Sequence, residues 1–170
     1  MTYDFEDGAG PVPAHQHSNG GGWVADSTRV VASAFVGPDA KVFGNARVYG
    51  NAVVYDNAVV YGTARVFDGA KVYGNAMVCG TARVFDGAKV CGNAVVYGNA
   101  KVCGNAKVYG YASVYGYASV HGYASVHGYA LVFGNALVFG NADVCGYAEV
   151  FGNAVVGMRL DAESLKIVPR

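Results

Sequence analysis

The sequence predicts an all-β fold, a parallel solenoid in which short strands and tight turns alternate every six residues. Three observations lead to this prediction. Valine stands at every sixth position from Val24 to Val156, alanine follows four residues after each valine from Ala34 to Ala154, and glycine or aspartate lies between them from residue 44 onward. A period of six excludes an amphipathic helix, because it does not keep apolar residues on one face of a helix with 3.6 residues per turn.

A single unit combines one short strand with one tight bend, as in Val48-Tyr49-Gly50-Asn51-Ala52-Val53. Each alanine lies two residues before the next valine, so both point to the same side of the strand and the residues flanking the valine point away. Gly50 and Asn51 predict the turn, because both residue types reach positive φ easily. Alanine then fits the narrow corners of a prism, and valine fills its flat sides.

Stacking of successive coils is required, because one unit cannot bury its apolar side chains alone. The chain has 23 valines in this inward position. Each contributes roughly 1.5–3 kcal/mol when buried, which explains how a sequence with so little leucine can hold a core. We therefore expect one continuous core along the whole solenoid.

The repeat resembles the hexapeptide-repeat family over roughly residues 24–156, and the VYGNA and VFGNA units are similar to bacterial and phage-associated proteins often labelled acetyltransferase-like. The resemblance implies a single-stranded left-handed parallel β-helix with three hexapeptides per triangular coil. The left hand comes from the resemblance alone, because the general preference for right-handed crossovers would argue against it. Three hexapeptides per coil give about seven coils and a length of roughly 35 Å at about 4.8 Å per coil.

The domain organisation expected is one solenoid, residues 24–156, with an N-terminal arm and cap at 1–23 and a C-terminal cap at 157–170. Pro11, Pro13 and the glycines at 20–22 predict a loose arm that ends in a cap near Trp23. At the other end, Asp161 is placed to begin a short helix as its N-cap. The apolar residues expected over the last coil are Met158, Leu160, Leu165 and Ile167. Caps are expected because open solenoid ends expose unpaired strand edges.

Composition narrows the class of protein. The 12 basic and 12 acidic side chains balance, so no net charge favours nucleic acid or an anionic membrane, and we expect no specific nucleic-acid binding. We expect neither membrane insertion nor a signal peptide, because no apolar run is long enough to span a bilayer and residues 1–10 are acidic without an apolar stretch. Four cysteines stand where other units have tyrosine or phenylalanine, and their spacing fits no metal site or disulfide framework: Cys79, Cys91, Cys103 and Cys145. They predict free thiols in a reducing compartment, the cytoplasm or a phage particle.

Two histidines within the coils, His121 and His127, are the catalytic candidates. The resemblance implies acyl transfer from a CoA or carrier-protein donor, or a metal-dependent carbonic anhydrase activity, both using histidines at subunit junctions. The two histidines fall on successive faces in positions that are aromatic in other units. A general base needs an orienting partner and a pocket, and the uninterrupted repeat predicts neither. We therefore expect surface histidines, no cofactor and no metal, since the coils offer no third histidine.

A second histidine pair, His15 and His17, precedes the repeat. In an extended segment the two would share one face, a geometry that suits zinc or copper. Asp4, Glu6 and Asp7 are near enough in sequence to add a carboxylate. The simpler interpretation, two solvated histidines in the arm, is favoured.

Outward residues taken in steps of 18 separate three faces. The first face carries a column that we call the basic ladder, beside Tyr49, Phe67 and Phe85: Arg29, Arg47, Arg65, Arg83 and Lys101. The second face carries Lys71, Lys89 and Lys107 beside Tyr55, Tyr73 and Tyr109. Repeated cations and aromatic rings could bind a polyanion or a glycan. The simpler interpretation, a copied unit whose charges keep a β surface soluble, is favoured, because Asp68 and Asp86 lie close by in the sequence and weaken the field.

The third face is almost entirely apolar on its outward side. Its apolar patch consists of Val59, Tyr61, Met77, Cys79, Val95, Tyr97, Leu131 and Phe133. Aligned over several coils, such residues would form a patch on the order of several hundred Å2, which is typical of an association surface. We expect a homo-oligomer, and the resemblance favours a trimer.

The functional prediction is a non-catalytic structural or binding β-solenoid that self-associates and presents repetitive surfaces, and the resemblance suggests a bacterial or phage assembly. Two alternatives stay open, an acyltransferase of the hexapeptide-repeat family and a solenoid that binds a polysaccharide or polyanion.

Overall fold

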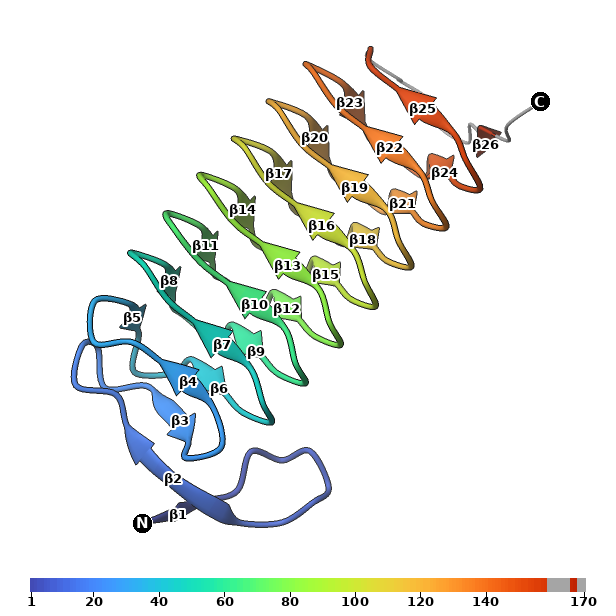
Figure 1. Ribbon diagram of the computed structural model, residues 1–170. Coiled ribbons are helices and arrows are strands. Elements are labelled where there is room, and N and C mark those ends of the chain that lie inside the picture. Colours follow the sequence, from blue (N-terminus) through green and yellow to red (C-terminus); the bar gives the residue numbers. More distant parts are fainter. Residues whose placement is uncertain (159–165, 168–170) are drawn as a thin grey trace.

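The computed structural model describes residues 1–158 and 166–167, and it is a parallel β-solenoid of about seven coils (Figure 1). The described residues contain no helix, so none is present that could cross a membrane. Three sheets run along the solenoid, with 8, 7 and 11 strands, and they form the first, second and third faces respectively. The predicted all-β parallel solenoid is confirmed.

Nearly all strands are two residues long, and their bounds follow the repeat. The first face holds β4 (Arg29–Val30), β7 (Arg47–Val48), β10 (Arg65–Val66), β13 (Arg83–Val84), β16 (Lys101–Val102), β19 (Ser119–Val120), β22 (Leu137–Val138) and β25 (Val155–Val156). The second face holds β5 (Phe35–Val36), β8 (Val53–Val54), β11 (Lys71–Val72), β14 (Lys89–Val90), β17 (Lys107–Val108), β20 (Ser125–Val126) and β23 (Asp143–Val144). The third face holds β1 (Thr2–Tyr3), β2 (Val12–Gln16), β3 (Trp23–Ala25), β6 (Lys41–Val42), β9 (Val59–Val60), β12 (Met77–Val78), β15 (Val95–Val96), β18 (Ser113–Val114), β21 (Leu131–Val132), β24 (Glu149–Val150) and β26 (Lys166–Ile167).

Successive coils pair in strict register. Each strand lies beside the strand 18 residues further on, as when Lys71 pairs with Lys89 and Met77 with Val95. The backbone amide of each outward residue donates to a carbonyl of the next coil, for example Lys71 N to Ala88 O at 2.9 Å. Three hexapeptides per coil are thereby confirmed, and every outward position belongs to a column that runs along one face.

The core consists of the inward valines and alanines. From Ala34 to Val138 every one of them is completely buried, and they form one continuous cluster. The expected placement of alanine inside the corners and valine along the sides is confirmed. Outward residues on the same strands are half-buried or exposed, so each strand divides cleanly into a core side and a surface side.

The corners differ from the expected turn in one respect. Only the first of the two turn residues has positive φ, as Gly74 does at 72°, and the asparagine after it does not. In the Asp68-Gly69 corner the aspartate takes this conformation, at 57°, although glycine is next to it. The carboxylate of Asp56, another such aspartate, accepts a hydrogen bond from the amide of Gly74 on the next coil at 3.1 Å. This bond helps a residue with a side chain to occupy a position that normally favours glycine.

The N-terminal residues form an ordered cap in place of the expected loose arm. Strand β1 pairs antiparallel with β2, and β2 pairs antiparallel with β3 at the edge of the third face (Figure 1). The ring of Tyr3 stacks on Trp23 at 4.3 Å, and Phe5 stacks on Phe43 at 4.9 Å. Aromatic packing onto the first coils holds the segment, and periodicity alone could not reveal it because these residues do not follow the repeat.

At the C-terminal end, strand β26 pairs parallel with β24 and continues the third face. The helix expected from Asp161, together with Leu160 and Leu165, lies outside the described residues. Met158 is exposed.

A leucine at a corner tests the packing. Ala88→Leu should lower the free energy of unfolding by about 1–3 kcal/mol, because the closed corner has no space for three more carbons. The neighbouring outward variant, Lys89→Leu, should change it by no more than about 0.5 kcal/mol. Thermal unfolding followed by circular dichroism measures both. Equal stabilities for the two variants would contradict the placement of alanine in the core.

Candidate functional site

The basic ladder forms one column of five cations in consecutive register positions of the first face. Arg29 pairs with Arg47, Arg47 with Arg65, Arg65 with Arg83, and Arg83 with Lys101. Neighbouring strands in a sheet lie about 4.8 Å apart, so each coil from β4 to β16 presents one cation at that spacing. Within the part of the chain that the structure describes, no carboxylate forms an ion pair with any of the five. Like charges directly opposite one another are unfavourable, so the column is a site of unsatisfied positive charge.

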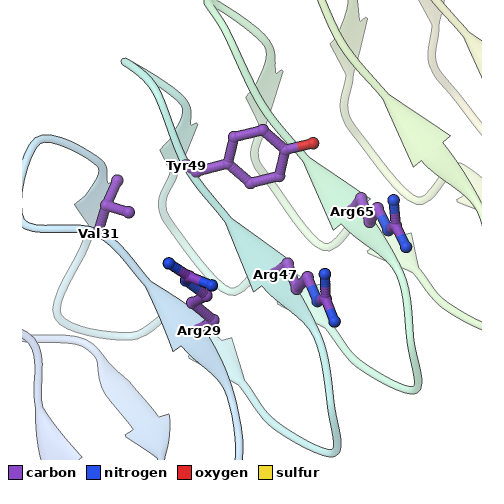
Figure 2. Close-up of a pocket in the computed structure, with 5 residues that line it drawn as sticks. All are labelled: Arg29, Val31, Arg47, Tyr49 and Arg65. Carbon is purple, nitrogen blue, oxygen red and sulfur yellow. The ribbon is translucent and has the colours of Figure 1, made fainter.

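A shallow groove accompanies the first coils of this ladder. It has a volume of about 330 Å3 and is lined by Arg29, Val31, Arg47, Tyr49 and Arg65. Figure 2 shows Arg47 and Arg65 extending from adjacent strands in the same direction, with the ring of Tyr49 on the neighbouring column. Guanidinium groups bind phosphate, sulfate and carboxylate oxygens through paired N–H donors. The groove can therefore receive anionic groups that follow one another along the solenoid axis.

The aspartates expected to weaken this field lie at the corner between the first and second faces. Asp86 has a φ of 59°, and its carboxylate accepts a hydrogen bond from the amide of Gly104 at 3.1 Å. The Asp86 carboxylate is thus hydrogen bonded within the corner, and it forms no ion pair with a residue of the basic ladder.

Aromatic rings form stacked ladders on all three faces, and each ladder is interrupted by a cysteine. Ring centroids lie 4.8 Å apart for Tyr49–Phe67, 4.9 Å for Tyr55–Tyr73 and 5.1 Å for Phe43–Tyr61. The interruptions are Cys103 on the first face, Cys91 on the second and Cys79 on the third, and all are half-buried free thiols. Sequence reasoning found these columns and cysteines, but it did not connect the two.

The catalytic candidates lie on successive faces, as expected, and the structure does not bring them together. His121 is on the first face, where its ring lies 5.8 Å from that of Phe139. His127 is on the second face, stacked on Tyr109 at 4.7 Å, and its Nε2 lies 2.9 Å from Asp143 Oδ1. The expectation that no partner orients these histidines is therefore wrong for His127. Asp143 was missed because it lies 16 residues away, diagonally across adjacent coils.

The two N-terminal histidines have different surroundings and different partners. His15 is exposed and its Nδ1 lies 2.6 Å from Asp26 Oδ1. His17 is only 6% exposed, and its Nδ1 accepts a hydrogen bond from the amide of Asn19 at 3.3 Å. The described residues contain no group of three His, Cys, Asp or Glu side chains placed to hold a metal ion.

The apolar patch lies on the third face, on strands β9, β12, β15 and β21. Val59 and Tyr61 pack against the cap cluster that contains Phe5, so the cap covers part of the patch. Met77 and Tyr97 are the most open members, at 37% exposure each. Ser113 on β18 interrupts the apolar column before Leu131.

Exposed tyrosines at the corners are a feature that sequence reasoning missed. Tyr117 and Tyr123 are about 70% exposed, and Tyr111, Tyr129 and Tyr147 form a stacked column at spacings of 5.0 and 5.1 Å. The signal was present, because each of them replaces the asparagine of the usual corner.

Comparison with known protein families agrees with the fold. A sequence model described as the YdcK β-solenoid repeat matches residues 40–55 and 46–62. This chain is a hexapeptide-repeat β-solenoid. The solenoid also matches the crystal structure of PerB from Caulobacter crescentus in complex with CoA and GDP-perosamine, with a TM-score of 0.38 and 16% identity. The match covers 76% of this chain and 53% of the PerB chain, so this chain spans about half the length of PerB. No curated protein matches the sequence.

Proposed function

We propose that this solenoid is a non-catalytic binding protein whose basic ladder holds an extended polymer of repeated phosphate or sulfate groups. The observation that carries the proposal is the register of five cations on consecutive strands without ion-pair partners among the described residues. Such a column has an electrostatic cost in the free protein, because like charges directly opposite are unfavourable. A bound polyanion would remove that cost.

Rigidity and composition add to the argument. Every coil is hydrogen bonded to the next, so the strands that carry the cations are held in place before the ligand arrives and only the side chains have to be ordered on binding. Between residues 29 and 107 the chain carries nine basic and four acidic side chains, although the whole chain is neutral. The central coils therefore present the positive charge, and the acidic residues of the N-terminal cap lie beyond them.

Binding of inorganic polyphosphate tests the proposal. The double variant Arg47→Gln/Arg65→Gln should weaken binding by about tenfold or more at low ionic strength, because two phosphate contacts are lost. The matched control Lys71→Gln/Lys107→Gln removes the same charge from the second face and should weaken binding by no more than about twofold. Isothermal titration calorimetry measures both. Equal losses would show a general charge effect, and absence of saturable binding to the parent protein would refute the proposal.

A second candidate function is self-association through the third face, in a trimer with parallel axes as the family resemblance suggests. Met77 and Tyr97 support it, because they are the most exposed members of the apolar patch. The part of the patch near the cap is already used within the chain. The patch available to another copy is therefore centred on β12 and β15.

Two lysines at the centre of this patch test the association. Met77→Lys/Val95→Lys should reduce the sedimentation mass toward the monomer, because each ammonium would lose hydration at several kcal/mol within an interface. On an exposed face the cost of each would stay within about 0.5 kcal/mol. Circular dichroism should show that the variant remains folded. A parent protein that sediments as a monomer at micromolar concentration would exclude the interface.

The acyltransferase alternative is favoured by one observation, the contact between His127 and Asp143. A carboxylate can orient an imidazole as a general base, but enclosure of the substrates is also needed. Residues 42–156 contain only two-residue corners, and no inserted loop covers the pair.

Turnover of acetyl-CoA separates the two interpretations. We expect no acetyl transfer to amines, sugars or hydroxylated metabolites, and no saturable CoA binding, because the flat second face does not enclose His127. Activity that is lost in His127→Ala and kept in His121→Ala would establish the enzyme. Acetyl-CoA and acceptor assays on the purified chain supply the measurement.

The four free thiols are consistent with a reducing compartment, and we propose the cytoplasm or a phage particle as the location. A role in a bacterial or phage assembly rests on the family resemblance of the repeat.

A further inference from the structure

A notch opens on the second face where Cys91 interrupts the aromatic ladder. Tyr73 and Tyr109 stand on the coils before and after it, and the cavity has a volume of about 300 Å3. Its lining residues are Tyr73, Lys89, Cys91, Lys107, Tyr109 and Ser125. This notch lies on a different face from the basic ladder, so it is independent of the function proposed above.

The width of the notch corresponds to one missing ring. Its two tyrosines are two coils apart, a separation of roughly 9.6 Å at about 4.8 Å per strand. The complete parts of the same ladder have ring spacings of 4.9 Å for Tyr55–Tyr73 and 4.7 Å for Tyr109–His127. A flat ring placed midway would therefore lie at an ordinary stacking distance from both walls. The small Cys91 side chain forms the floor.

Charge at the notch favours an anion. Lys89 and Lys107 lie in register on adjacent strands at its edge, and neither forms an ion pair with a carboxylate that the structure describes. Hydrogen bonding with the Cys91 thiol, together with burial, raises the pKa of Tyr73 to about 12. Burial and then the Asp143 carboxylate raise the pKa of Tyr109. Both phenol walls thus stay neutral at physiological pH and do not repel an anion.

The corresponding gap on the third face provides a comparison. Cys79 lies between Tyr61 and Tyr97 in the same way, but the residues beside it are Met77 and Val95. That gap can stack a ring and has no cation at its edge. The pair of lysines is therefore what distinguishes the second-face notch.

We propose that the notch binds a small aromatic carboxylate, with its ring between Tyr73 and Tyr109 and its carboxylate at Lys89 and Lys107. Stacking on two rings supplies the attraction for a flat apolar group, and the two ammonium groups fix its orientation. Saturated rings lack the flat faces that this arrangement requires. The site thus selects for shape and for charge at the same time.

Titration with 2-naphthoate tests the site. The parent protein should bind one molecule per chain with a Kd on the order of 1 mM, which is typical of a small ligand in an open site. Cyclohexanecarboxylate has the same charge without a flat ring, and its affinity should be lower by at least about tenfold. Binding is followed by calorimetry and by the shifts of tyrosine ring resonances in NMR spectra. Equal binding of the two carboxylates would overturn the proposal.

Filling the notch gives the second test. Cys91→Phe should abolish binding of 2-naphthoate and raise the melting temperature, because the new ring completes the ladder. The matched control Cys79→Phe adds the same ring on the third face and should leave 2-naphthoate binding unchanged. Binding that persists in a folded Cys91→Phe variant would overturn the proposal.

A charge variant decides the matter if Cys91→Phe does not fold. Lys89→Gln/Lys107→Gln should weaken 2-naphthoate binding by about tenfold, because both contacts to the carboxylate are lost. The control Lys71→Gln removes a cation from the same column, beyond the notch, and should have little effect. Unchanged affinity in the double variant would contradict the assigned site.

Discussion

From residue 44 onward the solenoid depends on the corner residue that turns the chain with a left-handed backbone. At Gly74, Gly92 and Gly110 φ lies near 70°, and these glycines stack directly on one another along the axis. A Cβ on Gly92 would lie 3.1 Å from the amide nitrogen of Gly110, which is closer than packing normally allows. Left-handed geometry and close stacking therefore both favour glycine, and every corner from residue 44 to residue 152 has a glycine or an aspartate in this conformation.

The recurrence of this backbone conformation keeps the register constant, and a constant register separates the core from the surface. The inward valines and alanines are the same on all coils, so outward residues can change without disturbing the packing. The binding properties of the surface then depend on which residues fill the outward columns: repeated charges, stacked rings, or a small residue that interrupts the rings. The basic ladder and the notch over Cys91 are two results of this arrangement on adjacent faces of one core.

Most of the fold could be predicted from the sequence. The six-residue repeat gives the spacing of the strands, identifies the inward valines and alanines, and shows which outward residues lie in one column. The N-terminal cap could not, since Tyr3 and Phe5 lie outside the repeat and their contacts are long-range aromatic stacking. The bond between His127 and Asp143 crosses two columns diagonally, and column-by-column reasoning misses it. The left-handed conformation of Asp68 beside a glycine was also missed, because residue preference alone assigns it to Gly69.

The most direct test of this account compares two glycines on consecutive corners. Gly92 has a φ of 69° and stacks on backbone atoms. At Gly87 the preceding Asp86 takes the left-handed conformation, and a Cβ would lie 2.8 Å from the rotatable Asn105 side chain and 3.3 Å from the carbonyl oxygen of Gly104. Gly92→Ala should lower the free energy of unfolding by at least about 1–2 kcal/mol. Gly87→Ala should change it by no more than about 0.5 kcal/mol, because the restriction of the unfolded chain by alanine offsets the small shift that these two contacts require. Denaturant unfolding of both variants measures the difference. Equal destabilisation by the two would contradict the claim that the left-handed corner residue controls the stability of the solenoid.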